Sequence, residues 1–318
     1  MSILVTGGTG FIGINIARLL AEQGRDVVVF DLSPLPEKGN VLAGVMDRVK
    51  MEIGSVTDLS QVLNVIKRNN VEGIIHCAAI MGNIPNKRPV EALQVNVIGT
   101  ANILEAARFM NLKRVVAMSS RAVMGRPEDI VTPRKEDEYC LPLSGIYPAS
   151  KICIEQLVYT YRDIYKLDVI AVRPCSVFGP GERTSGHNPD LLKILVMDAV
   201  AGKPIHYKTA GDFSDDVTYI KDFAKGAVQA YDCKAPTYYL YNLSYGKNTK
   251  MSEVCDVLKG LFPDVPIEMG PGPWDDPTAR QRAPQDITRA REDFGYEPEW
   301  PVERAIPDWV RWLKEGKY

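Results

Sequence analysis

The 318-residue sequence has few of the residues from which metal centres and disulfide frameworks are built. It contains only three histidines, and its six cysteines form no C-x-x-C pair. Structural zinc sites and disulfide frameworks both need several such residues at close, regular spacing. We therefore expect no metal and no structural disulfide, and this cysteine usage is typical of a protein in the reducing cytoplasm.

Long apolar runs and blocks of one charge are also missing. No stretch approaches the roughly 18 consecutive apolar residues that a membrane-spanning helix requires. The 38 basic and 40 acidic residues nearly cancel, so we expect neither nucleic acid nor a membrane as a partner. The first apolar strand begins at Ile3, which leads us to expect no signal peptide. A small-molecule substrate is the partner that remains.

The sequence does contain a glycine-rich loop at its start. An apolar strand over residues 3–6 runs into Gly7, Gly10 and Gly13, and a helical pattern follows at once. In dinucleotide-binding proteins such glycines allow a tight turn, close approach of the backbone to a pyrophosphate, and close helix packing. The helix N-terminus then offers N–H groups to the anion. The pattern predicts a bound dinucleotide.

Asp31 indicates which dinucleotide is bound. It ends the second apolar strand, 18 residues after Gly13, where an acid is expected to bond the adenosine ribose diol. The same carboxylate would repel the 2′-phosphate of NADP, and residues 32–34 supply no arginine to offset it. We therefore expect NAD as the cofactor.

Strands and helices alternate through the first half of the chain, which is typical of a doubly wound parallel sheet with ligands at the carboxyl ends of its strands. We expect an α/β Rossmann domain over residues 1–174 and a smaller α/β substrate-binding lobe over 175–318, with a helix near 222–232 returning to the first domain. The predicted strands are 3–6, 26–30, 50–52, 73–77, 114–118 and 168–173, and the predicted helices are 11–23, 58–69, 89–111 and 147–166.

A tyrosine and a lysine stand four residues apart, at Tyr147 and Lys151. On a helix they share one face. A tyrosine with a pKa of about 10 is a poor base at neutral pH, so we expect the lysine cation to lower that pKa. The phenol can then exchange a proton with a carbinol during hydride transfer to a nicotinamide. Ser119 and Ser120 follow the strand 114–118, at the edge of the sheet where ligands are expected. The alternative role for these serines is a strand-end cap, and the alternative for Tyr147 and Lys151 is a chance pair on the surface.

Taken in order, these motifs resemble the extended short-chain dehydrogenase/reductases, the NAD-dependent epimerase/dehydratase family. The resemblance covers nearly the whole chain and rests on residues 6–13, Asp58, Ala78-Ala79, Asn96, Ser120, Tyr147, Lys151, and Arg173-Pro174 with Gly179–Gly181.

The resemblance implies a catalytic set, a cofactor site and an oligomeric state. The catalytic residues are expected to be Ser120, Tyr147 and Lys151, with Ser120 preferred to Ser119 because it lies five residues before Gly125. A homodimer is expected through helices 89–111 and 147–166. The expected NAD site comprises Gly7, Gly10, Phe11, Ile12, Gly13, Asp31, Val56, Asp58, Ala78, Ala79, Asn96, Tyr147, Lys151, Pro174 and Val177.

Several positions depart from the family pattern. No acidic residue follows Ser120, which disfavours dehydratase chemistry. Asp215 stands where sugar-nucleotide members carry an arginine for the substrate pyrophosphate, and Ser176 replaces a usual asparagine. Arg280 and Arg282 are candidates for phosphate contacts instead, with surface solvation as the alternative.

Arg121, beside the expected catalytic serine, has two interpretations. A guanidinium can hold a substrate carboxylate with two hydrogen bonds, or it can form a salt bridge with a neighbouring acid. The candidate substrate residues are Arg121, Met81, Ser176, Arg183 and Arg282.

Three functions remain from the sequence. We favour an epimerase that transfers hydride at a carbinol of a sugar or sugar nucleotide, with Tyr147 as the acid and base. The alternative is a net NAD-dependent dehydrogenase of a smaller, carboxylate-bearing hydroxy substrate. A non-catalytic NAD-sensing protein is the third, and the intact Ser120, Tyr147 and Lys151 set counts against it.

Overall fold

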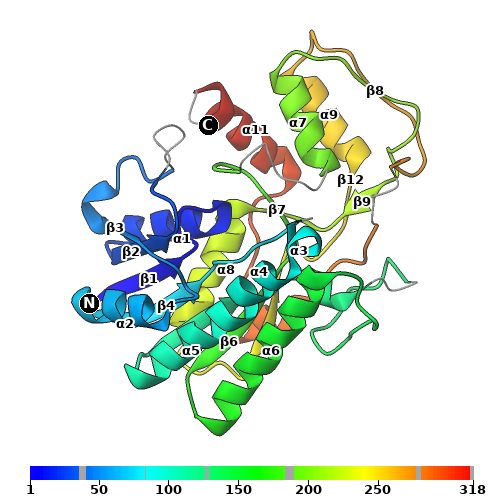
Figure 1. Cartoon of the computed structure of the whole chain (residues 1–318). Coiled ribbons are helices and arrows are strands. Elements are labelled where there is room, and N and C mark those ends of the chain that lie inside the picture. The colour runs from blue at the N-terminus through cyan, green and yellow to red at the C-terminus, as the bar shows by residue number, and fades with distance from the viewer. Residues whose placement is uncertain (36–40, 83, 126–128, 183–189, 277–280, 316–318) are drawn as a thin grey trace.

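The computed structural model describes residues 1–35, 41–82, 84–125, 129–182, 190–276 and 281–315. A seven-stranded sheet forms the centre of this part of the chain (Figure 1). Its order is β11-β6-β5-β4-β1-β2-β3, and all its pairs are parallel. The strands are β1 (Ser2–Thr6), β2 (Asp26–Asp31), β3 (Val49–Ile53), β4 (Val71–His76), β5 (Arg114–Met118), β6 (Val169–Pro174) and β11 (Leu240–Leu243).

The strand order places the carboxyl ends of β1 and β4 at the switch point of the sheet. The chain adds β2 and β3 on one side of β1 and then returns to add β4, β5 and β6 on the other. The connections on either side of this point lead in opposite directions and leave a crevice between them, which is where ligands bind in open α/β sheets. The fold therefore brings the glycine-rich loop and the segment after β4 together.

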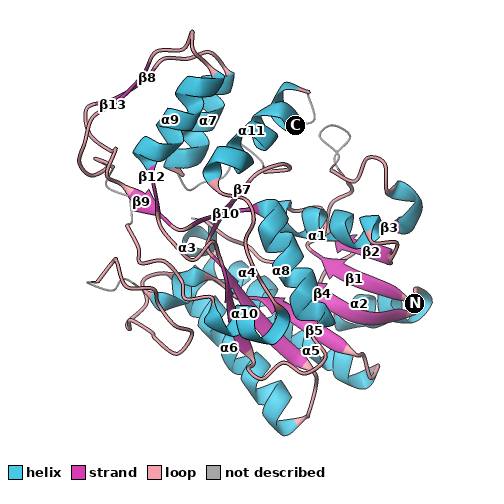
Figure 2. Cartoon of the chain, turned by 180° about the vertical axis from the view of Figure 1, so that it is seen from behind, coloured by secondary structure: helices cyan, strands magenta, loops and turns pink. Residues whose placement is uncertain are grey.

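Helices cover both faces of the sheet, and alternate strand residues pack on each. Leu4 and Val28 pack with α2, α5 and α6, whereas Ile3 and Val5 pack with α1 and α8. Burial on both faces explains why these strands read as nearly continuous apolar runs. The covering helices are α2 (Leu59–Arg68), α5 (Gly99–Phe109) and α6 (Ile146–Ile164) on one side, and α1 (Phe11–Glu22) and α8 (Ile220–Asp232) on the other (Figure 2).

The predicted helix over 89–111 is built from three pieces in the structure. The helix α4 (Pro89–Leu93) passes into a π-helical turn, Gln94–Ile98, which leads into α5. π-turns are rare and occur frequently at functional sites. This one carries Asn96 into the interior, where the residue is fully buried. A short helix α3 (Ile84–Lys87) precedes α4, and 3₁₀ turns lie at Met46–Arg48 and Arg121–Met124.

The second half of the chain forms a smaller lobe beyond the carboxyl edge of the sheet, with α7, α9 and α11 packed together (Figure 1). Its described residues also form three pairs of short strands, β7 (Ser176–Phe178) with β10 (Val217–Tyr219), β9 (Ser214–Asp215) with β12 (Thr249–Lys250), and β8 (Ile205–Tyr207) with β13 (Ile267–Met269). The lobe helices are α7 (Leu191–Val200), α9 (Met251–Leu261) and α11 (Val302–Lys314), whereas α10 (Thr288–Phe294) packs against β11 and α8.

The boundary expected at residue 174 does not separate the sheet from the lobe. The helix expected near 222–232 does return to the first half as α8, which packs against α1. The strand β11 returns as well and pairs with β6 at the edge of the main sheet. The run over residues 238–241 alternates as a strand does, but its pairing with β6 joins residues far apart in the sequence. The described chain therefore crosses between the two parts more than once.

Candidate active site

The glycine-rich loop lies tightly between β4 and α1. Gly7 has a φ of +63°, and a Cβ at this position would lie 2.6 Å from the backbone nitrogen of Ala78. A Cβ on Gly13 would lie 2.3 Å from the carbonyl oxygen of Gly7. A Cβ on Gly10, in contrast, would meet only one atom within 4 Å, the same Gly7 oxygen at 3.1 Å. The loop is therefore close-packed toward the protein and open beside Gly10, as a cradle for a ligand requires.

The N-terminus of α1 is suited to an anion. Among the described residues no side chain caps this helix, and its first turn holds no acid. Its leading N–H groups and the positive end of the helix dipole therefore face the open side of the loop. Asp31 lies alongside, because its Oδ2 accepts a hydrogen bond from the Thr9 N–H at 3.1 Å. Phe11 and Ile12 form the first turn of the helix. These features fit the pyrophosphate and ribose of NAD.

Asp58 and Val56, which the resemblance assigns to the NAD site, have structural roles of their own. Asp58 is the N-cap of α2, and its Oδ1 accepts from the backbone N–H groups of Ser60 at 2.9 Å and Gln61 at 3.1 Å. A hydrogen bond from the Ser60 hydroxyl at 2.8 Å, together with these two, holds the pKa of the carboxyl below its usual value. Val56 is buried against Gly99 of α5. Their contact with a cofactor stays a prediction.

Asn96 links the loop after β4 to the helix that carries Tyr147 and Lys151. Its Oδ1 accepts the Ile80 N–H at 2.7 Å, and its Nδ2 donates to the Ile80 carbonyl at 3.0 Å and to Ser150 Oγ at 3.0 Å. Ser150 Oγ in turn donates to the carbonyl of Tyr147 at 2.7 Å. The π-turn thus supports the loop that includes Ala78 and Ala79, and it also supports the first turn of α6.

The structure brings Ser120, Tyr147 and Lys151 together at the carboxyl edge of β5. Ser120 caps the turn after β5 by accepting the Ala122 N–H at 3.1 Å. Tyr147 and Lys151 lie one turn apart on α6, with Lys151 Nζ 5.5 Å from the centroid of the tyrosine ring. The lysine is buried, and Nζ donates to the carbonyl of Met118 at 2.7 Å. A hydroxyl, a phenol and an ammonium therefore share one site.

The expected lowering of the pKa of Tyr147 by Lys151 is not found in this structure. Burial raises the pKa of the phenol, and interactions with Ser120 and Arg282 oppose that rise without reversing it. Burial also lowers the pKa of Lys151 to about 8. The physical reason is that both groups are desolvated, which disfavours phenolate and ammonium alike.

Sequence reasoning missed the buried ion pair beneath these residues. Glu155 and Arg173 are both fully buried. The guanidinium binds both carboxylate oxygens, with Nε 2.7 Å from Oε1 and an NH2 nitrogen 2.9 Å from Oε2. Ser119 Oγ donates to Oε1 at 2.5 Å, and the Tyr139 hydroxyl donates to Oε2 at 2.9 Å. The available signal was spacing, because Glu155 follows Lys151 by one helical turn. Ser119 is thereby engaged in the network, while Ser120 faces Tyr147.

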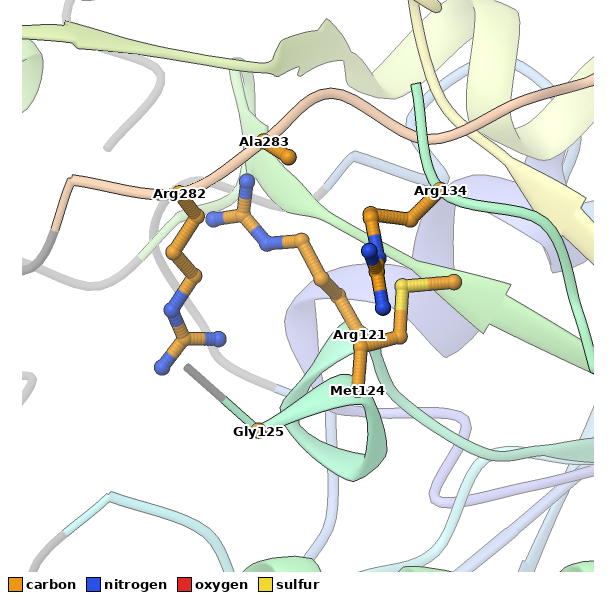
Figure 3. A pocket seen from close by; sticks show the side chains of 6 residues that line it. All are labelled: Arg121, Met124, Gly125, Arg134, Arg282 and Ala283. Atoms are coloured by element: carbon orange, nitrogen blue, oxygen red, sulfur yellow. The ribbon is translucent and has the colours of Figure 1, made fainter. Parts of the chain in front are cut away.

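Arg121 forms a salt bridge, the second of its two interpretations. Its NH1 and NH2 nitrogens lie 2.6 and 2.8 Å from the two oxygens of Asp215. NH2 also donates to Ser176 Oγ at 2.9 Å, and that hydroxyl donates to Asp215 at 2.6 Å. Figure 3 shows the Arg121 side chain running from the turn that contains Met124 toward the segment of Ala283. Asp215 is therefore not the uncompensated anion that the sequence suggested, and Arg121 and Ser176 do not offer a free pair of donors to a substrate.

The other expected substrate and nicotinamide contacts are distributed around the same edge. Met81 is exposed in the loop after β4, Pro174 is buried at the end of β6, and Val177 lies on β7. Arg282 is half-buried, and its charge acts on Tyr147. The cavity that Arg282 shares with Arg121 has a volume of about 10 Å³, room for a single water molecule (Figure 3). Arg183 and Arg280 lie outside the described residues.

The described residues contain no group of three histidine, cysteine, aspartate or glutamate side chains that could hold a metal ion. Within the same residues, no helix has the length and apolar character to cross a membrane.

Comparisons with known proteins identify the family and the fold. Residues 3–243 match the model of the NAD dependent epimerase/dehydratase family. A putative UDP-glucose 4-epimerase of Methanocaldococcus jannaschii is 30% identical over 319 residues, which cover 99% of each chain. The structure of a UDP-glucose 4-epimerase of Thermotoga maritima with UDP-glucose superposes with a TM-score of 0.86 at 23% identity and 99% coverage of each chain. An L-threonine dehydrogenase of Clostridium difficile has a TM-score of 0.84 at 22% identity, covering 99% of this chain and 98% of its own.

The Glu155–Arg173 pair gives a stability prediction. Replacement of Glu155 by Gln leaves a buried guanidinium without its counter-charge, so we expect a loss of about 3–5 kcal/mol in the free energy of unfolding. Denaturant unfolding measures this loss. The control is Glu105→Gln, which removes the charge of a half-exposed partner of Arg108 and should cost at most about 1 kcal/mol. Similar losses for the two variants would contradict the conclusion that Glu155 is the counter-charge of a buried arginine.

Proposed function

Since this chain belongs to the NAD-dependent epimerase/dehydratase family, we propose that it epimerises a nucleotide-linked sugar at a ring carbinol, with UDP-hexoses as the substrate class and C4 as the reacting carbon. The observation that carries the proposal is the position of the Tyr147 phenol beside Ser120 and Lys151, at the edge of the sheet where the glycine-rich loop opens. The names of relatives that span the whole chain, including the putative UDP-glucose 4-epimerase, support this substrate class.

Each residue of the site has its own role in such a reaction. Residues 7–13 and Asp31 would hold NAD, which when bound supplies the hydride acceptor and donor. Tyr147 takes the proton of the carbinol as the hydride leaves, and it returns a proton to the oxygen when the hydride comes back. Ser120 donates a hydrogen bond to the same oxygen. Lys151 is fixed by the Met118 carbonyl with Nζ 5.5 Å from the centroid of the Tyr147 ring, where its ammonium would stabilise negative charge that develops on the phenol during proton transfer.

The burial of the site fits this role. Burial raises the pKa of the Tyr147 phenol above its usual value, and the positive nicotinamide ring of bound NAD would oppose that rise. Withholding the base until the cofactor and substrate are in place limits side reactions with water. The proton transfer is thereby coupled to ligand binding.

Removal of the phenol oxygen tests the role of Tyr147. Tyr147→Phe should lower kcat by roughly 10²- to 10⁴-fold, because general acid–base catalysis contributes about that much. Retention of NAD should be unchanged, as measured by cofactor released on denaturation. Tyr159→Phe, at a half-exposed tyrosine of the same helix, is the matched control and should keep wild-type turnover. An active Tyr147→Phe variant would exclude the assignment.

Asp31 gives a prediction about cofactor choice. Asp31→Asn removes the negative charge that would meet a 2′-phosphate, so the preference for NAD over NADP should fall by at least about 10-fold. Binding titrations of both cofactors with wild type and variant measure it. An unchanged ratio would show that another part of the site selects NAD.

A specific observation keeps a second function open. Asp215 and Ser176 are engaged with Arg121, and Arg282 is the cation whose charge acts on Tyr147. A smaller hydroxy acid whose carboxylate binds Arg282 would fit a net dehydrogenase, and the fold is shared with one such enzyme. Net formation of NADH with a free hydroxy acid, and none with UDP-hexoses, would favour this alternative.

We further propose that the protein is a cytoplasmic homodimer joined through α4, α5 and α6. The helices α5 and α6 pack side by side (Figure 1), and they expose large apolar side chains that a second copy would cover. The free thiols of all six cysteines support a reducing compartment. The exposed residues are Val90 on α4, Ile98 on the π-turn, Phe109 on α5, and Tyr159 and Ile164 on α6.

The dimer is tested by placing a charge on this surface. Ile98 is 52% exposed in the single chain, so Ile98→Asp should leave the fold intact but bury an unpaired charge in the dimer. Sedimentation at micromolar concentration should show a dimer for wild type and a monomer for the variant. A monomeric wild type, or a variant that stays dimeric, would argue against this interface.

A further inference from the structure

An ion pair joins the two parts of the molecule immediately beside Ser120. Arg121 is the residue after Ser120, in the turn that Ser120 caps. Its partner Asp215 lies on β9 of the lobe, and Ser176 lies on β7. The three side chains form a closed ring of hydrogen bonds.

The ring is buried and geometrically specific. The side chains of Arg121 and Asp215 are only 8% and 14% exposed. A bidentate arginine–carboxylate pair fixes both the distance and the relative orientation of its partners. Because Ser120 is joined to Arg121 by one peptide bond, and its hydroxyl also caps the turn, movement of Asp215 is transmitted directly to Ser120.

The residue after Asp215 holds a second part of the site. Asp216 is fully buried, and its Oδ2 accepts the backbone N–H of Gln285 at 2.9 Å while Oδ1 accepts that of Tyr245 at 3.1 Å. The segment that begins at residue 281 carries Arg282. Asp215 and Asp216, where β9 ends and before β10 begins, therefore hold the turn of Ser120 and the segment of Arg282.

We propose that Asp215 is a positioning residue for catalysis, which acts through Arg121 to place the hydroxyl of Ser120 against Tyr147. The smaller lobe thus determines the position of the Ser120 hydroxyl, which follows strand β5 of the Rossmann sheet. This inference rests on the roles proposed above for Ser120 and Tyr147. It assigns Arg121 to the architecture of the reaction centre and not to a direct contact with substrate.

The sharpest test separates positioning from stability. The double variant Arg121→Met/Asp215→Leu replaces the pair with apolar side chains of similar size, a change that is often neutral for stability when a buried pair is removed completely. We expect its Tm to stay near that of wild type while kcat falls roughly 10- to 100-fold, since a misplacement of about 1 Å can cost that much. KM and NAD binding should be little changed. A stable double variant with wild-type kcat would overturn the proposal.

Two further variants complete the design. Arg121→Lys keeps the charge and the fold but loses the bidentate geometry, so its kcat should lie between those of wild type and the double variant; wild-type kcat here would also count against the proposal. Asp168→Asn is the control, because Asp168 forms a bidentate pair with Arg114 at the other end of β5. Its kcat should be that of wild type, and a comparable loss would show that any broken pair slows the enzyme.

A readout without substrate distinguishes this inference from the proposed function. The amides of Ala122 and Val123 bond to Ser120, so their hydrogen exchange reports the order of this turn. Exchange there should be faster in the double variant and unchanged in Asp168→Asn. Inactive wild-type protein whose exchange responds in this way would refute only the proposed reaction. Unchanged exchange in a folded double variant would refute the positioning role.

Discussion

The buried pair between Glu155 and Arg173 holds together the parts of the site that the sheet alone leaves independent. Glu155 belongs to α6 and Arg173 to β6, and the same carboxylate accepts hydrogen bonds from Ser119 at the end of β5 and from Tyr139. An ion pair with no exposure to solvent is stable only when its remaining bonding positions are filled. This constraint fixes the rotation of α6 about its axis, and thereby the direction in which Tyr147 and Lys151 point.

The positions of these groups follow from the chain order of the sheet. Because the strands are parallel, every loop that carries a functional residue leaves the sheet at one edge, and the reversal between β1 and β4 opens that edge for a cofactor. The lobe then closes over it, held by the strand pair of β7 with β10 and by the ion pair of Arg121. Arg121 and Asp215, the charged residues that depart from the family pattern, lie at this contact. They therefore affect how the two parts are joined as well as what the site binds.

Much of this arrangement could be predicted from local patterns. The glycines at 7, 10 and 13, the alternation of strands and helices, and the spacing of Tyr147 and Lys151 each reflect a rule that acts over a few residues. What could not be predicted depends on pairs distant in sequence. Arg121 meets Asp215 across 94 residues, and β11 joins the sheet from beyond the lobe. The rise in the pKa of Tyr147 likewise depends on burial by many segments, which no spacing reveals.

The central claim is that hydride leaves a sugar carbon and returns to the same carbon within one active site. The most direct measurement follows deuterium placed at C4 of UDP-galactose through conversion by the purified protein, with the product examined by NMR. The account predicts UDP-glucose that retains the deuterium at C4, without net NADH. Loss of the label to solvent, or its accumulation in released NADH, would contradict it.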